Sequence, residues 1–384
     1  MRILHLTAHL NTGGITTYLY NLSRGLMERG HEVFITSSGG SRQRDFECLG
    51  VQHRRIPLKI KSELHPRLWF EVLPALRRLV REDKIEILHA HKRVTQVLCQ
   101  VISRLDHVPY VSTCHGLYLI RLGRRIFPAW GDKVIAISDF VASYLTDNAR
   151  IPQSRVVTVF NALAPRAEDR FSPAERVVLR KAYGLKQDSI VVGGAGRFVK
   201  VKGMEELLYS AQILSNFHAD VQFLIVGDGR DREKLMDLKN ELLLDGQVSV
   251  LGDMKDLRPA LETMDIFVAP VRWEEGFGYS VLEAMAQGKP VVASKTGALP
   301  CLVEDGVTGY LIPPGDRDAL MRKIDDLISA PEKRQRMGEA ARQRAKTCFS
   351  WESMIGKTES VYDEVVVKPK GVAHGINRNN AKGN

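Results

Sequence analysis

The chain has 384 residues, which is enough for two domains of ordinary size, each with its own hydrophobic core. Hydrophobic residues make up 44% and charged residues 26% of the composition, as in soluble globular proteins, and no apolar run approaches the ~20 residues that span a bilayer. The five cysteines show no metal-ligand spacing, which argues against a zinc or disulfide scaffold and favours free thiols. Residues 1–9 hold only a short apolar run with two histidines, so we expect no signal peptide and a cytoplasmic location.

The formal net charge of +10 is concentrated in one part of the chain. Residues 51–130 contain fifteen Lys/Arg and six Asp/Glu, a local excess of nine. An anionic membrane surface or a phosphorylated acceptor would suit such a segment, whereas no nucleic-acid-binding motif is present and we expect no nucleic-acid partner. Within it, residues 64–80 mix Leu, Trp and Phe with arginines. This pattern fits either an amphipathic helix at a membrane interface or a surface helix packed on a sheet.

The first half of the chain alternates short apolar segments with segments of helical periodicity. Such alternation predicts a parallel, doubly wound α/β sheet. The predicted strands are 2–8, 32–37, 52–57, 85–91, 110–114, 133–138 and 156–161. The predicted helices are 16–29, 68–81, 94–105 and 140–148. A polar stretch at 164–176 then indicates a linker.

The second half repeats the alternation, so we expect a second α/β domain. Its predicted strands are 189–194, 221–226, 248–251, 266–269, 291–294 and 310–312. Its predicted helices include 202–215, 230–244 and 278–286. We therefore divide the chain into domains at 1–168 and 177–348, followed by a helical run at about 350–367. The polar, basic tail 368–384 is expected to be disordered.

The most informative motif is a pair of glutamates, Glu275 and Glu283, eight positions apart. Glu275 lies in a glycine-rich loop after the apolar strand 266–269, and Glu283 lies in the helix that this loop opens. The amides at a helix N-terminus form an anion site. Two carboxylates beside an anion site suit a ligand with phosphate in the middle and hydroxyls at both ends, which is the shape of a sugar nucleotide. Taken alone, acidic residues near a helix start more often only complement the helix dipole.

The segment 275–294, with 304–310 and 313–316 after it, resembles the retaining glycosyltransferases of family 4, which have the GT-B architecture. The resemblance extends from residue 1 to about 365. It implies two Rossmann-like, doubly wound domains that face an interdomain cleft. The first domain would take the acceptor and the second the nucleotide-sugar donor, and the helix at about 350–367 would cross back to the first domain. In open α/β sheets ligands bind outside the carboxyl ends of the strands, where the informative loops of this chain fall.

The resemblance assigns roles to the donor-side residues. Arg197 and Lys202, which follow the predicted strand 189–194, match the family's diphosphate clamp, and both cations would stabilise the leaving nucleoside diphosphate. Glu275 would bind the sugar hydroxyls and Glu283 the ribose hydroxyls. The remaining donor-binding candidates are Gly13, Gly14, Gly196, Gly276, Phe277, Gly278, Tyr279 and Ser280. Gly196 also belongs to the start of a dinucleotide-type G-x-G, but valine at position 199 argues against that class.

On the first domain, His115 matches the family's active-site histidine beside the transferred sugar. A histidine at the end of a strand is in general more often structural, but two at neighbouring strand ends favour a site. This argument applies to His115 and leaves the role of His91 open; His91, Lys92 and Arg93 are the acceptor-side candidates. The resemblance implies no metal and no cofactor.

These assignments predict a retaining, metal-independent glycosyltransferase that moves a sugar from a nucleoside diphosphate to an acceptor hydroxyl. A lipopolysaccharide core or another lipid-linked envelope glycan would suit the basic first domain, as would peripheral contact with the inner face of the cytoplasmic membrane. A sugar-nucleotide 2-epimerase of the same fold and a non-enzymatic binder of anionic membrane or nucleic acid are the alternatives. An epimerase would act on the donor alone, and a binder would keep its affinity without the two glutamates.

Overall fold

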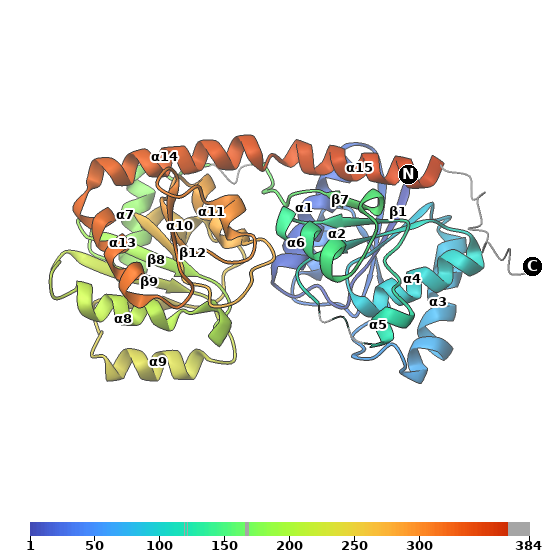
Figure 1. The fold of residues 1–384 in the computed structure, drawn as a ribbon, viewed down its shortest axis with the longest axis horizontal. Helices are drawn as coiled ribbons and strands as arrows, with labels where there is room; N and C mark the ends of the chain where they lie inside the picture. The colour runs from blue at the N-terminus through green and yellow to red at the C-terminus, as the bar shows by residue number, and fades with distance from the viewer. Residues whose placement is uncertain (119, 121, 166–168, 368–384) are drawn as a thin grey trace, which may run out of the picture.

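A computed structural model describes residues 1–118, 120, 122–165 and 169–367. Figure 1 shows two α/β domains side by side, with the helices α14 (Pro331–Cys348) and α15 (Trp351–Val367) running above both of them. The tail predicted to be disordered, 368–384, lies outside the described residues.

The first domain is built on a seven-stranded, entirely parallel sheet of order β3-β2-β1-β4-β5-β6-β7. Its strands are β1 (Arg2–Leu6), β2 (Glu32–Ser37), β3 (Gln52–Arg55), β4 (Ile87–Ala90), β5 (Tyr110–Cys114), β6 (Lys133–Ala136) and β7 (Val156–Thr158). The strand order reverses between β1 and β4, so the loops after these strands open at a topological switch point. This confirms the predicted doubly wound fold.

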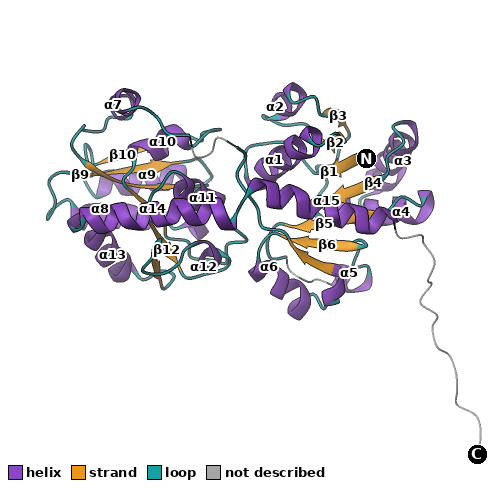
Figure 2. Ribbon diagram, turned by 90° about the horizontal axis from the view of Figure 1, so that it is seen from above, coloured by secondary structure: helices purple, strands orange, loops and turns teal. Residues whose placement is uncertain are grey.

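Helices cover both faces of this sheet (Figure 2). They are α1 (Gly14–Glu28), α2 (Gln43–Cys48), α3 (Leu73–Glu82), α4 (Arg93–Asp106), α5 (Leu122–Ile126) and α6 (Asp139–Ser143). Short turns of π- or 3-10 helix lie at Leu68–Val72, Tyr144–Asn148 and Gln153–Arg155. On one face α1 packs with α15, and their apolar side chains share one core cluster with β1, β2 and β4. On the other face α3 and α4 pack together and cover a second cluster.

The second domain contains a six-stranded parallel sheet of order β10-β9-β8-β11-β12-β13. Its strands are β8 (Ile190–Ala195), β9 (Val221–Val226), β10 (Val248–Leu251), β11 (Ile266–Ala269), β12 (Val291–Ser294) and β13 (Gly309–Ile312). Its helices are α7 (Pro173–Ala182), α8 (Glu205–Leu214), α9 (Arg232–Glu241), α10 (Arg258–Thr263), α11 (Tyr279–Ala286), α12 (Leu299–Leu302) and α13 (Arg317–Ser329), with a 3-10 turn at Lys200–Lys202. The order again reverses, here between β8 and β11.

Two sequence-based expectations need correction. The stretch 164–176 is not all linker, because α7 begins at Pro173 and packs against α10. Ser172 accepts a hydrogen bond from the amide of Glu175, and the Glu175 carboxylate accepts one from the amide of Ser172, which is a capping box within a polar segment. The segment 64–80 is mainly a packed surface helix, since its apolar positions such as Leu76 are buried. Leu64 and Phe70 are the exceptions, with 82% and 85% of their surfaces exposed.

Among the described residues, no helix combines the length and apolar character needed to cross a membrane.

Candidate active site

The loops at the carboxyl ends of the two sheets meet between the domains. The Ser138 hydroxyl, after β6, donates a hydrogen bond of 2.9 Å to the carbonyl oxygen of Gly276 in the loop after β11. A Cβ atom added to Gly276 would lie 2.7 Å from the carbonyl oxygen of His115, so glycine permits this close approach of two backbones. A Cβ atom added to Gly14, at the start of α1, would lie 3.6 Å from the ring of Tyr279. We call this junction the interdomain site.

The N-terminus of α11 presents free amides to the interdomain site. Gly278 caps the helix with φ of 103°, a left-handed conformation that a glycine adopts without strain. Within the described residues, no hydrogen bond uses the backbone N–H groups from Phe277 to Ser280. A hydrogen bond fixes the loop before the helix, because the Ala298 amide donates to the Glu275 carbonyl oxygen at 2.8 Å. Four unpaired donors at the positive end of a helix are the geometry that suits an anion, and anion binding by these residues stays a prediction.

Two cations of the second domain stand beside these amides. Lys202, at the end of the 3-10 turn after β8, forms a close ion pair with Glu275, and each side chain is only about one-fifth exposed. Arg197, in the loop between β8 and this turn, is exposed and has no side-chain partner among the described residues. Gly196 lies next to the aliphatic chain of Lys202. The structure thus brings the predicted clamp residues to the edge of the sheet that carries α11.

Glu283 lies in α11, four residues after Tyr279, the first residue of the helix. Burial and the nearby carboxylate of Asp256 raise the pKa of Glu283 to about 7, against the opposing effect of Arg42. Arg42 belongs to the first domain, where it caps α2, so the two domains interact electrostatically at this point. A second interdomain contact is the ion pair of Lys255 with Asp45, at 3.4 Å.

The first domain contributes His115 at the end of β5. Its ring is half-buried, and burial together with the charge of Lys92 lowers the pKa of His115 to about 3, so the imidazole is neutral. Lys92 is itself close to Arg197 of the other domain, because burial and then the charge of Arg197 lower its pKa. Lys92 of the first domain and Arg197 of the second therefore lie within range of each other's charge, and Lys202 pairs with Glu275 in the facing loop.

Two acceptor-side predictions are wrong in the form proposed. His91 is fully buried and bonded to the His115 ring, so it cannot touch an acceptor. Arg93 pairs with Glu63 and donates hydrogen bonds to three backbone carbonyls between residues 123 and 128, so its guanidinium holds a loop in place. Both errors have one cause, since a short run of charged residues after a strand does not reveal which side chains turn inward.

Sequence reasoning also missed Ser138 and Arg42. Ser138 follows a strand at the same sheet edge as His91 and His115, and this position was the available signal. Arg42 carried no signal, because its proximity to Glu283 depends on how the two domains pack.

Two parallel α/β domains, with an anion site, cations and carboxylates gathered where their strand ends meet, define a GT-B type glycosyltransferase. The comparison with protein families agrees. Residues 12–165 match the model described as Glycosyltransferase Family 4, and residues 176–344 match the model described as Glycosyl transferases group 1. The chain belongs to this glycosyltransferase family and is an enzyme of that class.

Individual relatives are distant but extend over the whole chain. The chain is similar to N-acetyl-alpha-D-glucosaminyl L-malate synthase of Bacillus anthracis, with 24% identity, covering 94% of this chain and 96% of the relative. It is 28% identical to a capsular polysaccharide biosynthesis glycosyltransferase of Staphylococcus aureus, over 90% and 93% of the two chains. Among solved structures, a glycosyltransferase of Rickettsia africae superposes with a TM-score of 0.85 at 20% identity, over 96% and 99%. An Anabaena protein in complex with UDP-glucose gives 0.82 at 21%, over 94% and 99%.

Proposed function

We propose that this enzyme transfers a sugar from a nucleoside diphosphate to an acceptor hydroxyl with retention of configuration, without a bound metal. The observation that supports this most directly is the set of four unpaired amides at the start of α11, flanked by Lys202 and Arg197. A diphosphate carries two or more negative charges, and these groups meet them without a divalent cation. The fold neighbour from Anabaena was solved with UDP-glucose, which supports a nucleotide-sugar donor.

Donor binding in this proposal exchanges the partners of the Lys202–Glu275 pair. The diphosphate takes Lys202 and the amides from Phe277 to Ser280, and the sugar hydroxyls take the Glu275 carboxylate. Glu283 accepts hydrogen bonds from the ribose hydroxyls, and the absence of side chains at Gly13 and Gly14 lets the ligand approach the backbone. His115 faces the sugar from the first domain.

In the transfer step, the bond between the anomeric carbon and the phosphate oxygen breaks, and the electron pair leaves with the phosphate. The acceptor oxygen bonds to the same face of the sugar and passes its proton to the departing phosphate. Arg197 and Lys202 stabilise the leaving group because its negative charge increases in the transition state. This front-face route agrees with the family resemblance and needs no nucleophile from the protein.

We propose a cell-envelope glycan as the acceptor. The relatives' names support this, since one acts in capsular polysaccharide biosynthesis and one structural neighbour in lipopolysaccharide biosynthesis. A surface on the first domain supports a lipid-linked form of it. Four large apolar side chains of this surface are 70–85% exposed: Leu64, Phe70, Leu122 and Ile126.

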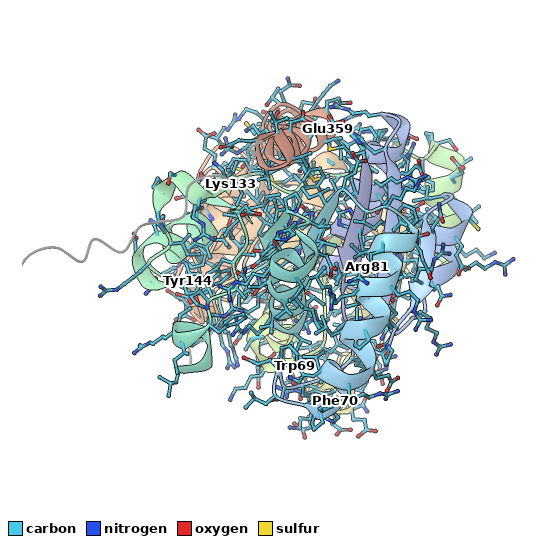
Figure 3. All side chains as sticks on the ribbon, turned by 90° about the vertical axis from the view of Figure 1, so that its right-hand side faces the viewer. Trp69, Phe70, Arg81, Lys133, Tyr144 and Glu359 are labelled. Atoms are coloured by element: carbon cyan, nitrogen blue, oxygen red, sulfur yellow. The ribbon has the colours of Figure 1, made fainter. Side chains whose placement is uncertain are left out.

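These four residues lie on neighbouring segments. The Trp69 indole donates a hydrogen bond to the Glu63 carbonyl oxygen at 3.1 Å, and Gly123 lies beside the Glu63 side chain. Figure 3 shows Trp69 and Phe70 at one end of the domain, with Arg81 further along the same helical segment. Exposed basic residues flank the patch, among them Lys61 and Arg125. Apolar side chains within a basic surface fit an anionic bilayer.

A donor screen tests the activity. UDP-, GDP- and ADP-sugars are compared by thermal shift, and a donor at about 100 times its Kd should stabilise the fold by about 2.7 kcal/mol. NMR of the product then gives the anomeric configuration, and a chelator should leave the rate unchanged. Inversion, or loss of activity on chelation, would contradict the proposed mechanism. Formation of an epimer from the donor alone would instead indicate the epimerase.

Vesicle sedimentation tests the membrane surface. The protein should sediment with vesicles of phosphatidylglycerol but not of phosphatidylcholine, and 1 M salt should release it. Exchange of Phe70 and Leu122 for serine together should abolish sedimentation. The matched control is Leu243→Ser, which changes a similarly exposed leucine on the second domain. Equal sedimentation of both variants would refute the proposed surface.

A further inference from the structure

A row of histidines lies behind the interdomain site on one face of the first sheet. His5 of β1, His89 of β4 and His91 just after β4 are fully buried, and His115 follows β5. Burial lowers the pKa of His5 to about 3, and burial also lowers the pKa values of His89 and His91. The helices α1 and α15 cover this face. Each imidazole of the row is therefore neutral, with one N–H donor and one acceptor nitrogen.

Three of these rings form one hydrogen-bonded chain. His5 Nδ1 lies 3.1 Å from His91 Nε2, and His91 Nδ1 lies 3.1 Å from His115 Nε2. His89 stands outside the chain, because its two nitrogens bond to the hydroxyls of Tyr362 and Thr113, each at 2.7 Å. At the deep end His5 Nε2 is buried without a partner. At the other end the Nδ1 of His115 makes no hydrogen bond within the described residues.

Only two proton orders satisfy both bonds of the chain. In the outward order His5 donates to His91 and His91 donates to His115, which leaves the His115 Nδ1–H facing the interdomain site. In the inward order each bond is reversed, and His5 then carries an N–H group with no acceptor. In the outward order the lone pair of His5 Nε2 is the group of the chain left unpaired in the core, since the His115 Nδ1 is not among the buried atoms without a partner. Orphaned buried N–H groups are rarer than under-satisfied acceptors, so the outward order is the more stable one.

The hydrogen-bonded chain explains the positions of these histidines better than a bound metal ion does. His5, His89 and His91 can place one nitrogen each within 4.8 Å of one another. However, a metal would have to displace one of the two hydroxyls that occupy the nitrogens of His89. The distance of 3.1 Å between His5 and His91 is that of a hydrogen bond, and it is shorter than the roughly 3.4 Å expected for two ligands about 2.1 Å from one tetrahedral ion.

We propose that His91, supported by His5, is a positioning residue that fixes His115 as an Nδ1–H donor toward the ligand. His115 then donates a hydrogen bond to an oxygen of the bound sugar nucleotide, and does not act as a base. This role rests on the transferase function proposed above, but the tautomer itself exists without substrate. It explains why a polar chain is kept in the core of the first domain, where apolar side chains would pack equally well.

The test is ¹⁵N NMR of histidine-labelled protein without ligand, with the His115 signals assigned by their loss in His115→Gln. At neutral pH, wild type should show a protonated Nδ1 and a bare Nε2 on His115. His91→Asn keeps an amide donor near the position of the His91 Nδ1 and should preserve this pattern. His91→Asp offers only an acceptor and should move a proton onto His115 Nε2. If His91→Asp does not fold, the wild-type and asparagine spectra still decide.

Kinetics separate positioning from packing. His91→Leu, which suits a buried site, should lower kcat/KM for the donor by about tenfold or more, whereas His91→Asn should stay within about threefold of wild type. A neutral His115 with its proton on Nε2 in wild type would overturn the proposal, and so would one equivalent of bound zinc in metal analysis. Full activity of His91→Leu would show that the three hydrogen-bonded histidines only fill space in the core, and it would contradict the positioning role of His91. If the spectra are as expected but no donor is turned over, the tautomer stands and the proposed function fails.

Discussion

Glu283 offers the sharpest test of the site, because its ionisation works against the fold. Its pKa is raised from the ordinary value of 4.5 to about 7, mainly by burial and then by Asp256. Below pH 4.5 the carboxyl is mostly protonated in the folded and in the unfolded chain, so it does not lower the free energy of unfolding. As the pH rises toward 7, the unfolded chain loses this proton more readily than the folded one, so the fold loses stability.

The perturbation is Glu283→Gln, which keeps the shape and removes the ionisation. One pKa unit corresponds to about 1.4 kcal/mol, so the penalty in wild type grows from about 1 kcal/mol at about pH 5 to about 3 kcal/mol at about pH 8. The free energy of unfolding of the variant, relative to wild type, should therefore rise by about 2 kcal/mol or more over this range. Subtracting wild type cancels the titration of all other groups. The same change should weaken donor binding tenfold or more, since the ribose loses its charged acceptor.

Urea unfolding at the two pH values measures this difference. The matched control is Glu274→Gln, which changes an exposed glutamate in the loop before α11. The control should show no change in relative stability with pH. A difference that stays constant within about 0.5 kcal/mol, or that falls with rising pH, would refute the reasoning about Glu283. A variant that binds donor as tightly as wild type would refute its ribose role while leaving the pKa argument intact.

Three further predictions concern the facing loops. Lys202→Met should lower the rate at which sugar transfer produces nucleoside diphosphate by about a hundredfold or more, while Lys200→Met in the same turn should leave this rate unchanged. Equal rates for the two variants would show that Lys202 does not bind the diphosphate. Gly276→Ala should cost on the order of a hundredfold in kcat without unfolding either domain, because the added methyl would lie 2.7 Å from the backbone of the facing domain. Gly356→Ala, which meets only the end of an arginine side chain at 3.5 Å, is its control in a rate assay. Glu275→Gln should abolish sugar transfer and yet bind the bare nucleoside diphosphate at least as well as wild type, as calorimetry would show.

The fold was predictable because its signals are local. Each buried strand of a parallel sheet is a short apolar run, and the loops after β1, β5, β8 and β11 carry glycine together with polar or charged residues. The free amides at the start of α11 follow from the same logic, since Gly278 opens a helix whose first residues have no side-chain cap. Hence the position of this helix N-terminus could be predicted from sequence alone, whereas its binding of an anion stays a prediction.

The inward direction of side chains could not be predicted. His91 and Arg93 follow one strand within three residues, but one joins a buried histidine chain and the other anchors a loop. Which way each turns depends on His5 and Glu63, which are far away in sequence. The same holds for Arg42, whose effect on Glu283 exists only when the domains are packed. Long-range contacts of this kind leave no periodic signal in a single sequence.

The Lys202–Glu275 pair links the ligand-free structure to turnover. Without ligand the two charges satisfy each other in a site that is about one-fifth exposed, where an unpaired charge would cost more than at the surface. In the proposed mechanism, a nucleoside diphosphate alone would take Lys202 and leave the Glu275 carboxylate without a cation, whereas the intact donor would also bring hydroxyls for that carboxylate. Once the sugar has moved to the acceptor, Glu275 competes with the diphosphate for Lys202. The pair that forms the donor site therefore also favours release of the product, and a site with fewer charges would hold it longer.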